Sequence, residues 1–583
     1  MEQEESSNEQ APEASEPVFG NNILIIHPGS YWIRIGRATD AYPVSVPHVI
    51  ARKPKQRESS QNFEDKLIIR HGINHPNSNS QKQHALKMVQ QAIWAKKTSS
   101  GQRRQNVALS EVTNYNDEVQ PQTLDDNSGL TWTPNSEQSE FFIGEEALYL
   151  DPNESYHIHW PIRQGRFNLH AGVGGSITAV LQDMETIWSA IIETKLDIPS
   201  KDFKNYKVVL LVPDIYCRPH VKELMNLVLT RLGFGAAIIH QESVCALYGS
   251  GISSACVVDV GDQKTSISCV EDGLSNRNSR LCMGYGGSDV TRCFTSLLQR
   301  AHMPYRECQM EKTMDALLLI ELKETFCHLD QDLDGTQLLD FHVRYPNSPT
   351  IMYQLKLGDE TLQAPMGLFY PQLFGIVGEK MVKTQQRNQG DAEDAHDENY
   401  LLQTQQQAAK AKALEKAAAE NNNQDGNANT NRSTSPTNHH NDIIQAEAPP
   451  PTISRRISTS QSLDKALGVD QAILHSIDCC SSEETKKKMY SCILVVGGGL
   501  GLFQGAVDML QYRIQSKMPP SFRAVVDKVE VICKSKDMDP RLTVWKGGAV
   551  LSCLDTAQEL WIKQKEWKAM GLKVLRERSP FVW

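Results

Sequence analysis

The sequence lacks the features that mark several large classes of protein. None of its apolar runs reaches 18 residues, so we expect no membrane-spanning helix. Residues 1–18 contain six Glu and neither Lys nor Arg, which is unlike a secretory signal and indicates a disordered acidic tail. The 13 Cys residues form no CxxC pair and no Cys/His cluster. A disulfide scaffold and a zinc finger are therefore excluded, and reduced, mostly buried thiols of an intracellular protein are expected.

An excess of positive charge is also missing. The chain has 583 residues, with 60 Lys and Arg against 70 Asp and Glu, which gives a net charge of −10. A uniformly basic nucleic-acid binder is excluded, although a local basic patch is not. The length suggests several domains or one large two-lobed domain, and an apolar fraction of 40% implies that some stretches do not pack.

Two internal stretches have compositions unlike a folded core. Residues 98–140 are rich in Ser, Gln, Asn and Thr, which favours a loop excursion. Residues 384–462 run through Gln, Ala and Asn tracts and a Pro triplet, which indicates a disordered, low-complexity insertion. Within it, the basic pair Arg455–Arg456 before Ser458 resembles a basophilic kinase site.

Elsewhere, buried-strand runs alternate with amphipathic helices, which is typical of the α/β class. The clearest segments are the strands Lys207–Asp214, Cys492–Gly499 and Lys528–Lys534, the helix Val221–Leu232 and a helix that starts near Gly505.

Two hairpins about 230 residues apart resemble each other. Ile23–Arg37 reads ILIIHPGSYWIRIGR and Ala255–Val270 reads ACVVDVGDQKTSISCV, each an aliphatic run followed by a Gly turn and a second strand. Such a turn points backbone N–H groups at one spot and can bind phosphate, although either segment alone could be an unrelated hairpin. A third Gly-rich turn, Gly497–Gly505, joins a strand to a helix, where amides can also approach a nucleotide.

Several further stretches resemble the actin superfamily. They are GSYWIRIGRATDAYPVSVPHVIARK, FFIGEEAL with WPI and DMETIW, ESVCALYGSG, GYGGSDVTRCF, ELKETFCHL and VWKGGAVLSCLDTAQELWIKQKEWKAMG. The resemblance implies an actin-like two-lobed fold of duplicated ribonuclease-H-like domains. The first lobe would comprise residues 19–249 and 543–583, with a polar insertion within 51–143, and the second residues 250–542. The stretches HPGS, DVGDQKTS and DETLQAPMGLFYP resemble the nuclear actin-related proteins of INO-eighty-type chromatin remodellers.

The resemblance also implies a site for ATP or ADP with Mg²⁺. Its binding residues would be Gly29, Ser30, Tyr31, Asp259, Val260, Gly261, Asp262, Lys323, Glu324, Gly498, Gly499 and Arg541. Asp259 would hold the metal through water. In that reading Lys323 and Glu324 contact the adenosine and Arg541 leans on the base.

Three departures from the family pattern concern hydrolysis. His27 stands where actin-like ATPases place a carboxylate near Mg²⁺, and imidazole is a poor ligand for that cation. Glu242 replaces the Gln that helps to position the attacking water, which brings negative charge toward the phosphates, and Ser266 replaces a His. Because phosphoryl transfer depends on positioning and charge stabilisation, we expect binding with little or no hydrolysis and no catalytic residues.

Basic side chains suggest a contact with DNA phosphates, which give affinity without base reading. The candidates are Arg52, Lys53, Lys55, Arg57, Lys82, Lys87, Lys96 and Lys97, and solvated charge is the plainer interpretation of them. The resemblance implies a nuclear, non-polymerising scaffold with no membrane contact. Its partners would be actin, a second nuclear actin-related protein, a long helix of the motor subunit, histones and nucleosomal DNA. An active ATPase or phosphotransferase, and a filament component, remain the alternatives.

Overall fold

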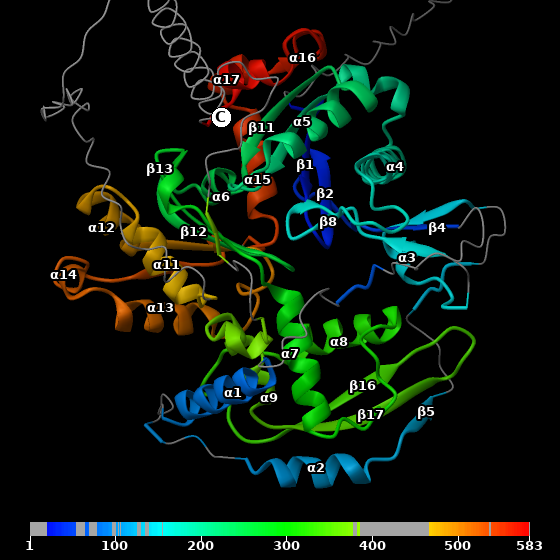
Figure 1. The fold of residues 1–583 in the computed structure, drawn as a ribbon, viewed down its shortest axis with the longest axis vertical. Coiled ribbons are helices and arrows are strands. Elements are labelled where there is room, and N and C mark those ends of the chain that lie inside the picture. Colours follow the sequence, from blue (N-terminus) through cyan, green and yellow to red (C-terminus); the bar gives the residue numbers. More distant parts are fainter. Residues whose placement is uncertain are drawn as a thin grey trace, which may run out of the picture. The chain divides into compact units, whose positions relative to one another are not determined.

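Two β-sheets of the same design form the centre of the structure, a computed structural model (Figure 1). The residues that it describes are 20–53, 65–68, 78–95, 101–102, 104, 107–124, 130–134, 139–153, 156–376, 382–384, 466–535 and 538–581. The acidic tail, nearly all of the low-complexity insertion and Ser458 lie outside the described residues.

The first sheet has six strands. In spatial order they are β21 (Ile562–Lys563), β11 (Ala236–Gln241), β10 (Lys207–Val212), β1 (Ile23–Pro28), β2 (Trp32–Arg37) and β3 (Val44–Pro47). Strand β1 pairs in parallel with β10 and antiparallel with β2. Every residue of β1 is buried, because helices cover both faces of the sheet, and this explains its unbroken apolar run.

The second sheet repeats this strand order when its strands are listed from the opposite edge. Its strands are β18 (Val382–Thr384), β15 (Leu281–Met283), β13 (Thr265–Glu271), β12 (Ser254–Val260), β19 (Cys492–Val496) and β20 (Glu530–Ile532), with β14 (Leu274–Ser275) beside β13. Strands β20, β19, β12, β13 and β15 correspond to β11, β10, β1, β2 and β3. Strand β12 pairs in parallel with β19 and antiparallel with β13, as β1 does with β10 and β2. The likeness between the two hairpins in the sequence therefore reflects a duplicated domain.

Helices α6 (Glu242–Ser250) and α15 (Thr543–Ser552) join the two sheets (Figure 1). Their backbones approach so closely that a Cβ on Gly547 would lie 1.6 Å from the carbonyl oxygen of Cys245, and one on Gly249 would lie 2.1 Å from that of Thr543. Only glycine fits at these two positions. One apolar cluster runs through this junction and includes Ile25 of the first sheet and Val257 of the second.

Most of the remaining helices cover the two large sheets. With the first sheet lie α4 (Ile177–Lys195), α5 (Arg218–Asn226), α16 (Gln564–Met570) and α17 (Val574–Arg578), whereas α3 (Glu145–Leu148) packs on β4 (Ile50–Arg52) and β6 (Phe141–Ile143). Helices α11 (Val469–Asp478), α12 (Glu483–Ser491) and α13 (Ala506–Lys517) pack on the second sheet, and α14 (Pro520–Arg523) follows them. Helices α7 (Gly287–Arg300), α8 (Thr313–Phe326) and α9 (Glu360–Gln363) form a separate group in which α7 contacts α8 and α9, and α8 contacts β16 (Gln337–Val343). Helix α4 shows why they form: Ser176 caps its first turn, and Val180, Met184, Ile187 and Ile191 bury one face.

Three small sheets complete the described residues. They are β6 (Phe141–Ile143) with β4 (Ile50–Arg52) and β7 (His157–His159); β16 (Gln337–Val343) with β17 (Thr350–Leu357) and β5 (Gln122–Leu124); and β8 (Ile162–Arg163) with β9 (Arg166–Phe167). No helix among the described residues is long and apolar enough to cross a bilayer.

The expectation of a loop over residues 98–140 is wrong in its described part. Helix α2 (Leu109–Glu118) and β5 fold there and dock on the second lobe, where β5 pairs with β17 (Figure 1). The buried amide of Asn116 donates to the carbonyls of Ala301 and Lys356 (2.7 and 3.0 Å), so polar contacts hold the helix together with the buried side chain of Val112. Helix α1 (Ser78–Trp94) docks on the same lobe. We call α1, Arg104, α2 and β5 together the docked insertion.

Candidate nucleotide site

The two hairpins close with the same hydrogen bond. The amide of Gly29 donates to the carbonyl of Trp32, and the amide of Gly261 donates to that of Lys264, both at 2.9 Å. In the described part of the chain, the amides of Ser30 and Asp262 in these turns have no backbone acceptor. Each turn therefore keeps N–H groups available to an anion, as the sequence predicts.

The third glycine turn packs directly on the second hairpin. The amide of Gly499 donates to the carbonyl of Val260 at 2.8 Å, and the amide of Gly287, at the start of α7, donates to that of Gly261 at 3.0 Å. A Cβ on Gly499 would lie 2.6 Å from the carbonyl oxygen of Gly261, so any side chain there would separate the two turns. The fold thus brings together the turns that the sequence singled out.

The loop between β8 and β9 spans the two hairpins. The amide of Gly165 donates to Ser30 Oγ and the amide of Gln164 donates to Gln263 Oε1, both at 3.2 Å. A hydrogen bond also holds the turn of the first hairpin, because His48 Nδ1 donates to the carbonyl of Gly29 at 3.0 Å. Burial lowers the pKa of His48 to about 4, so this histidine is neutral and its Nε2 accepts from Trp188.

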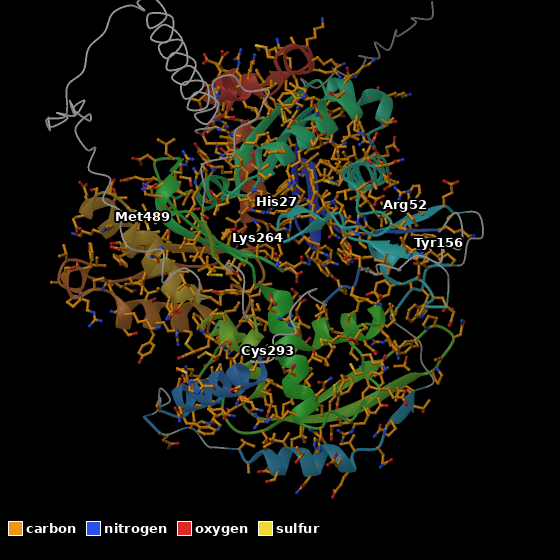
Figure 2. All side chains as sticks on the ribbon, in the orientation of Figure 1. His27, Arg52, Tyr156, Lys264, Cys293 and Met489 are labelled. Carbon is orange, nitrogen blue, oxygen red and sulfur yellow. The ribbon has the colours of Figure 1, made fainter. Side chains whose placement is uncertain are left out.

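Two of the departures from the family pattern contact each other and a lysine. His27 Nε2 lies 3.3 Å from Glu242 Oε1, and Lys264 Nζ donates to Glu242 Oε2 at 2.5 Å. Figure 2 labels His27 and Lys264 where the two sheets meet. Burial alone would raise the pKa of Glu242, but Lys264 and His27 lower it to about 2. We call His27, Glu242 and Lys264 the charged triad; it neutralises the charge that Glu242 was expected to bring toward the phosphates.

Asp259 and Ser266 lie on neighbouring strands of the second sheet. They are directly opposite each other on β12 and β13, so their side chains share a face. Burial raises the pKa of Asp259, and the nearby ammonium of Lys264 offsets part of this effect. Burial likewise raises the pKa of Asp262, which Lys323 partly offsets. Lys264 is thus the main counter-ion of two carboxylates, Glu242 and Asp259.

The sequence analysis did not single out Arg34, which belongs to the same site. Arg34 is opposite His27 on β2, and its Nε is buried without a partner among the described residues. Burial lowers the pKa of Arg34 to about 10, with Arg541 adding repulsion, so the guanidinium is still charged at neutral pH. A buried, incompletely paired cation beside two amide nests is suited to an anionic ligand. The signal was available, because Arg34 is a cation between two isoleucines in the middle of a strand.

The residues expected near the adenosine have different degrees of exposure. Lys323 is buried on α8, while the side chain of Glu324 is 64% exposed. Arg541 packs against Gly498, where an added Cβ would lie 3.3 Å from its Cγ and Cδ, and pairs with Asp539 at 2.6 Å. Tyr31 packs on Trp160 with ring centroids 5.5 Å apart, and burial, with Asp262 and Glu324 nearby, raises the pKa of its hydroxyl.

Mg²⁺ in nucleotide sites usually keeps several water ligands and takes one or two carboxylates together with the phosphates of its substrate. At Glu242 each oxygen already has a partner, His27 or Lys264. Two more carboxylates, Asp259 and Asp214, lie close by. Lys264 partly compensates Asp259, and Asp214 accepts from the amide and the hydroxyl of Ser243. Among the residues described, no group of three or more His, Cys, Asp or Glu could hold a metal ion.

The side chains proposed for DNA contact have different environments. Arg52 pairs with Asp183 at 2.5 Å and lies apart from the charged triad in Figure 2. Lys82 is half-buried on the second lobe beside Gly375, and burial lowers its pKa. Lys53 and Lys87 are exposed. Lys55, Arg57, Lys96 and Lys97 lie outside the described residues.

Comparison with known proteins agrees with this architecture. The actin family model matches residues 20–580. The chain belongs to the actin family. It is 56% identical to actin-related protein 8 of Bos taurus over 584 residues, covering 97% of this chain and 93% of the relative. The human protein of that name is 55% identical with the same coverage, and that of Aedes aegypti is 37% identical over 99% of this chain and 100% of its own.

A solved structure within the actin family is also similar. It is human actin-related protein Arp8 in its ATP-bound state, with a TM-score of 0.83, 52% identity and 98% of each chain covered. The expected actin-like fold and the resemblance to actin-related proteins are thus confirmed. The bounds of the two lobes, and the role of each site residue, stay predictions.

Proposed function

We propose that this protein is a nuclear scaffold subunit of an INO-eighty-type chromatin remodeller, which binds ATP (or ADP) with little or no hydrolysis and does not polymerise. One observation carries the nucleotide part: the amide nests of both hairpins are formed, while Glu242 is fully engaged by His27 and Lys264. The likeness to a human relative whose structure is described as ATP-bound supports binding.

The same observation argues against efficient turnover. A group that orients the attacking water must be a good acceptor, and each oxygen of Glu242 already accepts a hydrogen bond, one from His27 and one from the Lys264 ammonium, which weakens it as an acceptor for water. Ser266 cannot replace the imidazole expected at its position, because a hydroxyl is a much weaker base. Since phosphoryl transfer depends on such positioning, turnover should be orders of magnitude slower than in a competent ATPase.

The scaffold part rests on the family and on the docked insertion. Residues that follow β4 cross to the second lobe and pack there instead of leaving a short, compact subdomain for the next protomer of a filament. The expected partners are actin, a second nuclear actin-related protein, a long helix of the motor subunit, and histones and DNA of nucleosomes. This placement would give the protein roles in transcription regulation and DNA repair.

Three measurements test the proposal. Denaturing the purified protein and separating the released nucleotides should yield ATP or ADP close to one per chain. A single-turnover assay should show the bound ATP persisting long after a competent ATPase has hydrolysed its own. Affinity purification from nuclei should recover the remodeller subunits. Turnover at the rate of an active ATPase would refute the proposed lack of hydrolysis, and purification without the remodeller subunits would refute the scaffold role.

A further inference from the structure

Lys264 occupies a special place in the candidate site. It is the last residue of the second hairpin turn, where its carbonyl accepts from the amide of Gly261 while its side chain extends to Glu242 at 2.5 Å. Its stem is held on the other side, because a Cβ on Gly165 would lie 3.1 Å from Lys264 Cδ. The ammonium is thus fixed between the two hairpins that would hold a polyphosphate.

The charged groups around this ammonium already compensate one another in part, which reduces the need for a divalent cation. Arg34 adds a second fixed positive charge on the neighbouring strand β2, with its Nε unpaired. Lys264 is the main cation that compensates Glu242 and Asp259. The nearby carboxylate of Asp214 accepts from Ser243 and Ser275. A metal placed between Glu242 and Asp259 would lie beside the Lys264 ammonium and would meet a Glu242 carboxylate whose oxygens both have partners, which is unfavourable for an ion of charge +2.

We infer that the ammonium of Lys264, held by Glu242, replaces the divalent cation, so that the protein binds ATP without Mg²⁺. The inference rests on the nucleotide binding proposed above. Glu242 positions the ammonium, His27 holds the other oxygen of that carboxylate, and Arg34 shares the charge of the phosphates. The charged triad is then a built-in counter-ion, and two of the three departures that argue against hydrolysis, His27 and Glu242, belong to it.

The test compares ATP affinity in excess EDTA and in excess MgCl₂, using nucleotide-stripped full-length protein and equilibrium dialysis with labelled ATP. We expect the two dissociation constants of the unaltered protein to agree within about threefold. A tenfold or greater loss in EDTA overturns the inference but leaves nucleotide binding intact. Absence of binding in both buffers instead refutes the proposed function, so the two failures are distinguishable.

Variants of Lys264 test whether this side chain is responsible for ATP binding without Mg²⁺. Lys264→Met should lose at least tenfold in ATP affinity in EDTA, and Lys264→Arg, which keeps the charge, should lose much less. Because Lys264→Met leaves Glu242 buried without a cation, the double variant Lys264→Met/Glu242→Gln provides a second, charge-balanced test with the same expected loss. Lys195→Met, at an exposed position on α4, is the matched control and should bind as the unaltered protein does. Full affinity of both Lys264→Met variants in EDTA would show that another group neutralises the phosphates.

Discussion

Replacing Asp359 should release the docked insertion from the second lobe. Arg104 Nη2 donates to Asp359 Oδ1 at 2.8 Å, and the two side chains are only 3% and 7% exposed. The indole of Trp94, at the end of α1, donates to the other carboxylate oxygen at 3.1 Å. In Asp359→Ala, Arg104 would keep its bond to the carbonyl of Gln331 but would be a buried cation without a counter-ion.

The expected cost follows from the burial of this pair. Removing one partner of a buried ion pair costs about 3–5 kcal/mol, because the remaining charge has lost its compensation. We expect that loss in the local stability of the docked insertion, so the amides of α2 and β5 should exchange with deuterium at least about a hundredfold faster. Hydrogen exchange resolved by mass spectrometry is the measurement, with α4 as the internal reference.

Two comparisons make this prediction specific. The double variant Arg104→Met/Asp359→Leu removes both charges and should recover most of the protection, since apolar groups of similar size often replace a buried pair at little cost. Asp117→Ala removes a partner of Arg306 from a pair whose side chains are 51% and 46% exposed, and should leave the exchange rates unchanged. Unchanged exchange in Asp359→Ala would refute the reasoning.

Four further predictions concern binding and stability. Arg34→Met should weaken ATP binding at least tenfold in equilibrium dialysis, since a charge-assisted hydrogen bond contributes about 1.5–3 kcal/mol. The melting temperature should fall between pH 6.5 and 4, because the unfolded state then protonates a histidine that burial keeps neutral in the fold; with a pKa of about 4, His48 contributes up to roughly 3 kcal/mol of this loss, and His48→Asn should flatten the profile. Deleting residues 384–462 should leave the melting temperature nearly unchanged, since closing a long loop costs little more than closing a short one. Lys87→Ala should lower the log–log salt slope of DNA binding by about 0.9, whereas Lys82→Ala, whose ammonium lies on the second lobe, should not.

The phosphate-binding turns could be predicted because their chemistry is local. A glycine turn between two aliphatic strands specifies its own hairpin, and the repeat at Ile23–Arg37 and Ala255–Val270 indicated a duplicated domain. The docked insertion could not be predicted in the same way. Helix α2 has a polar sequence that resembles a loop, and it buries only Val112 and Asn116. Its stability comes from its partners on the second lobe, which the local sequence does not reveal.

The charged triad shows where reading each position separately fails. His27, Glu242 and Lys264 lie on β1, at the start of α6 and in the β12–β13 turn, and no local pattern reports that they touch. Taken alone, Glu242 is an uncompensated charge in the core, a substitution that costs several kcal/mol unless a cation accompanies it.

Taken together, the three residues balance. Against the expected family pattern, one carboxylate is absent at His27, one is added at Glu242, and Lys264 supplies a positive charge that the chain itself carries. The number of carboxylates at these two positions is therefore unchanged. If Lys264 serves as the counter-ion that we infer, the site would hold a triphosphate beside a Glu242 that is a weak acceptor for water, which is the combination that our proposal of a structural rather than a catalytic use of ATP requires.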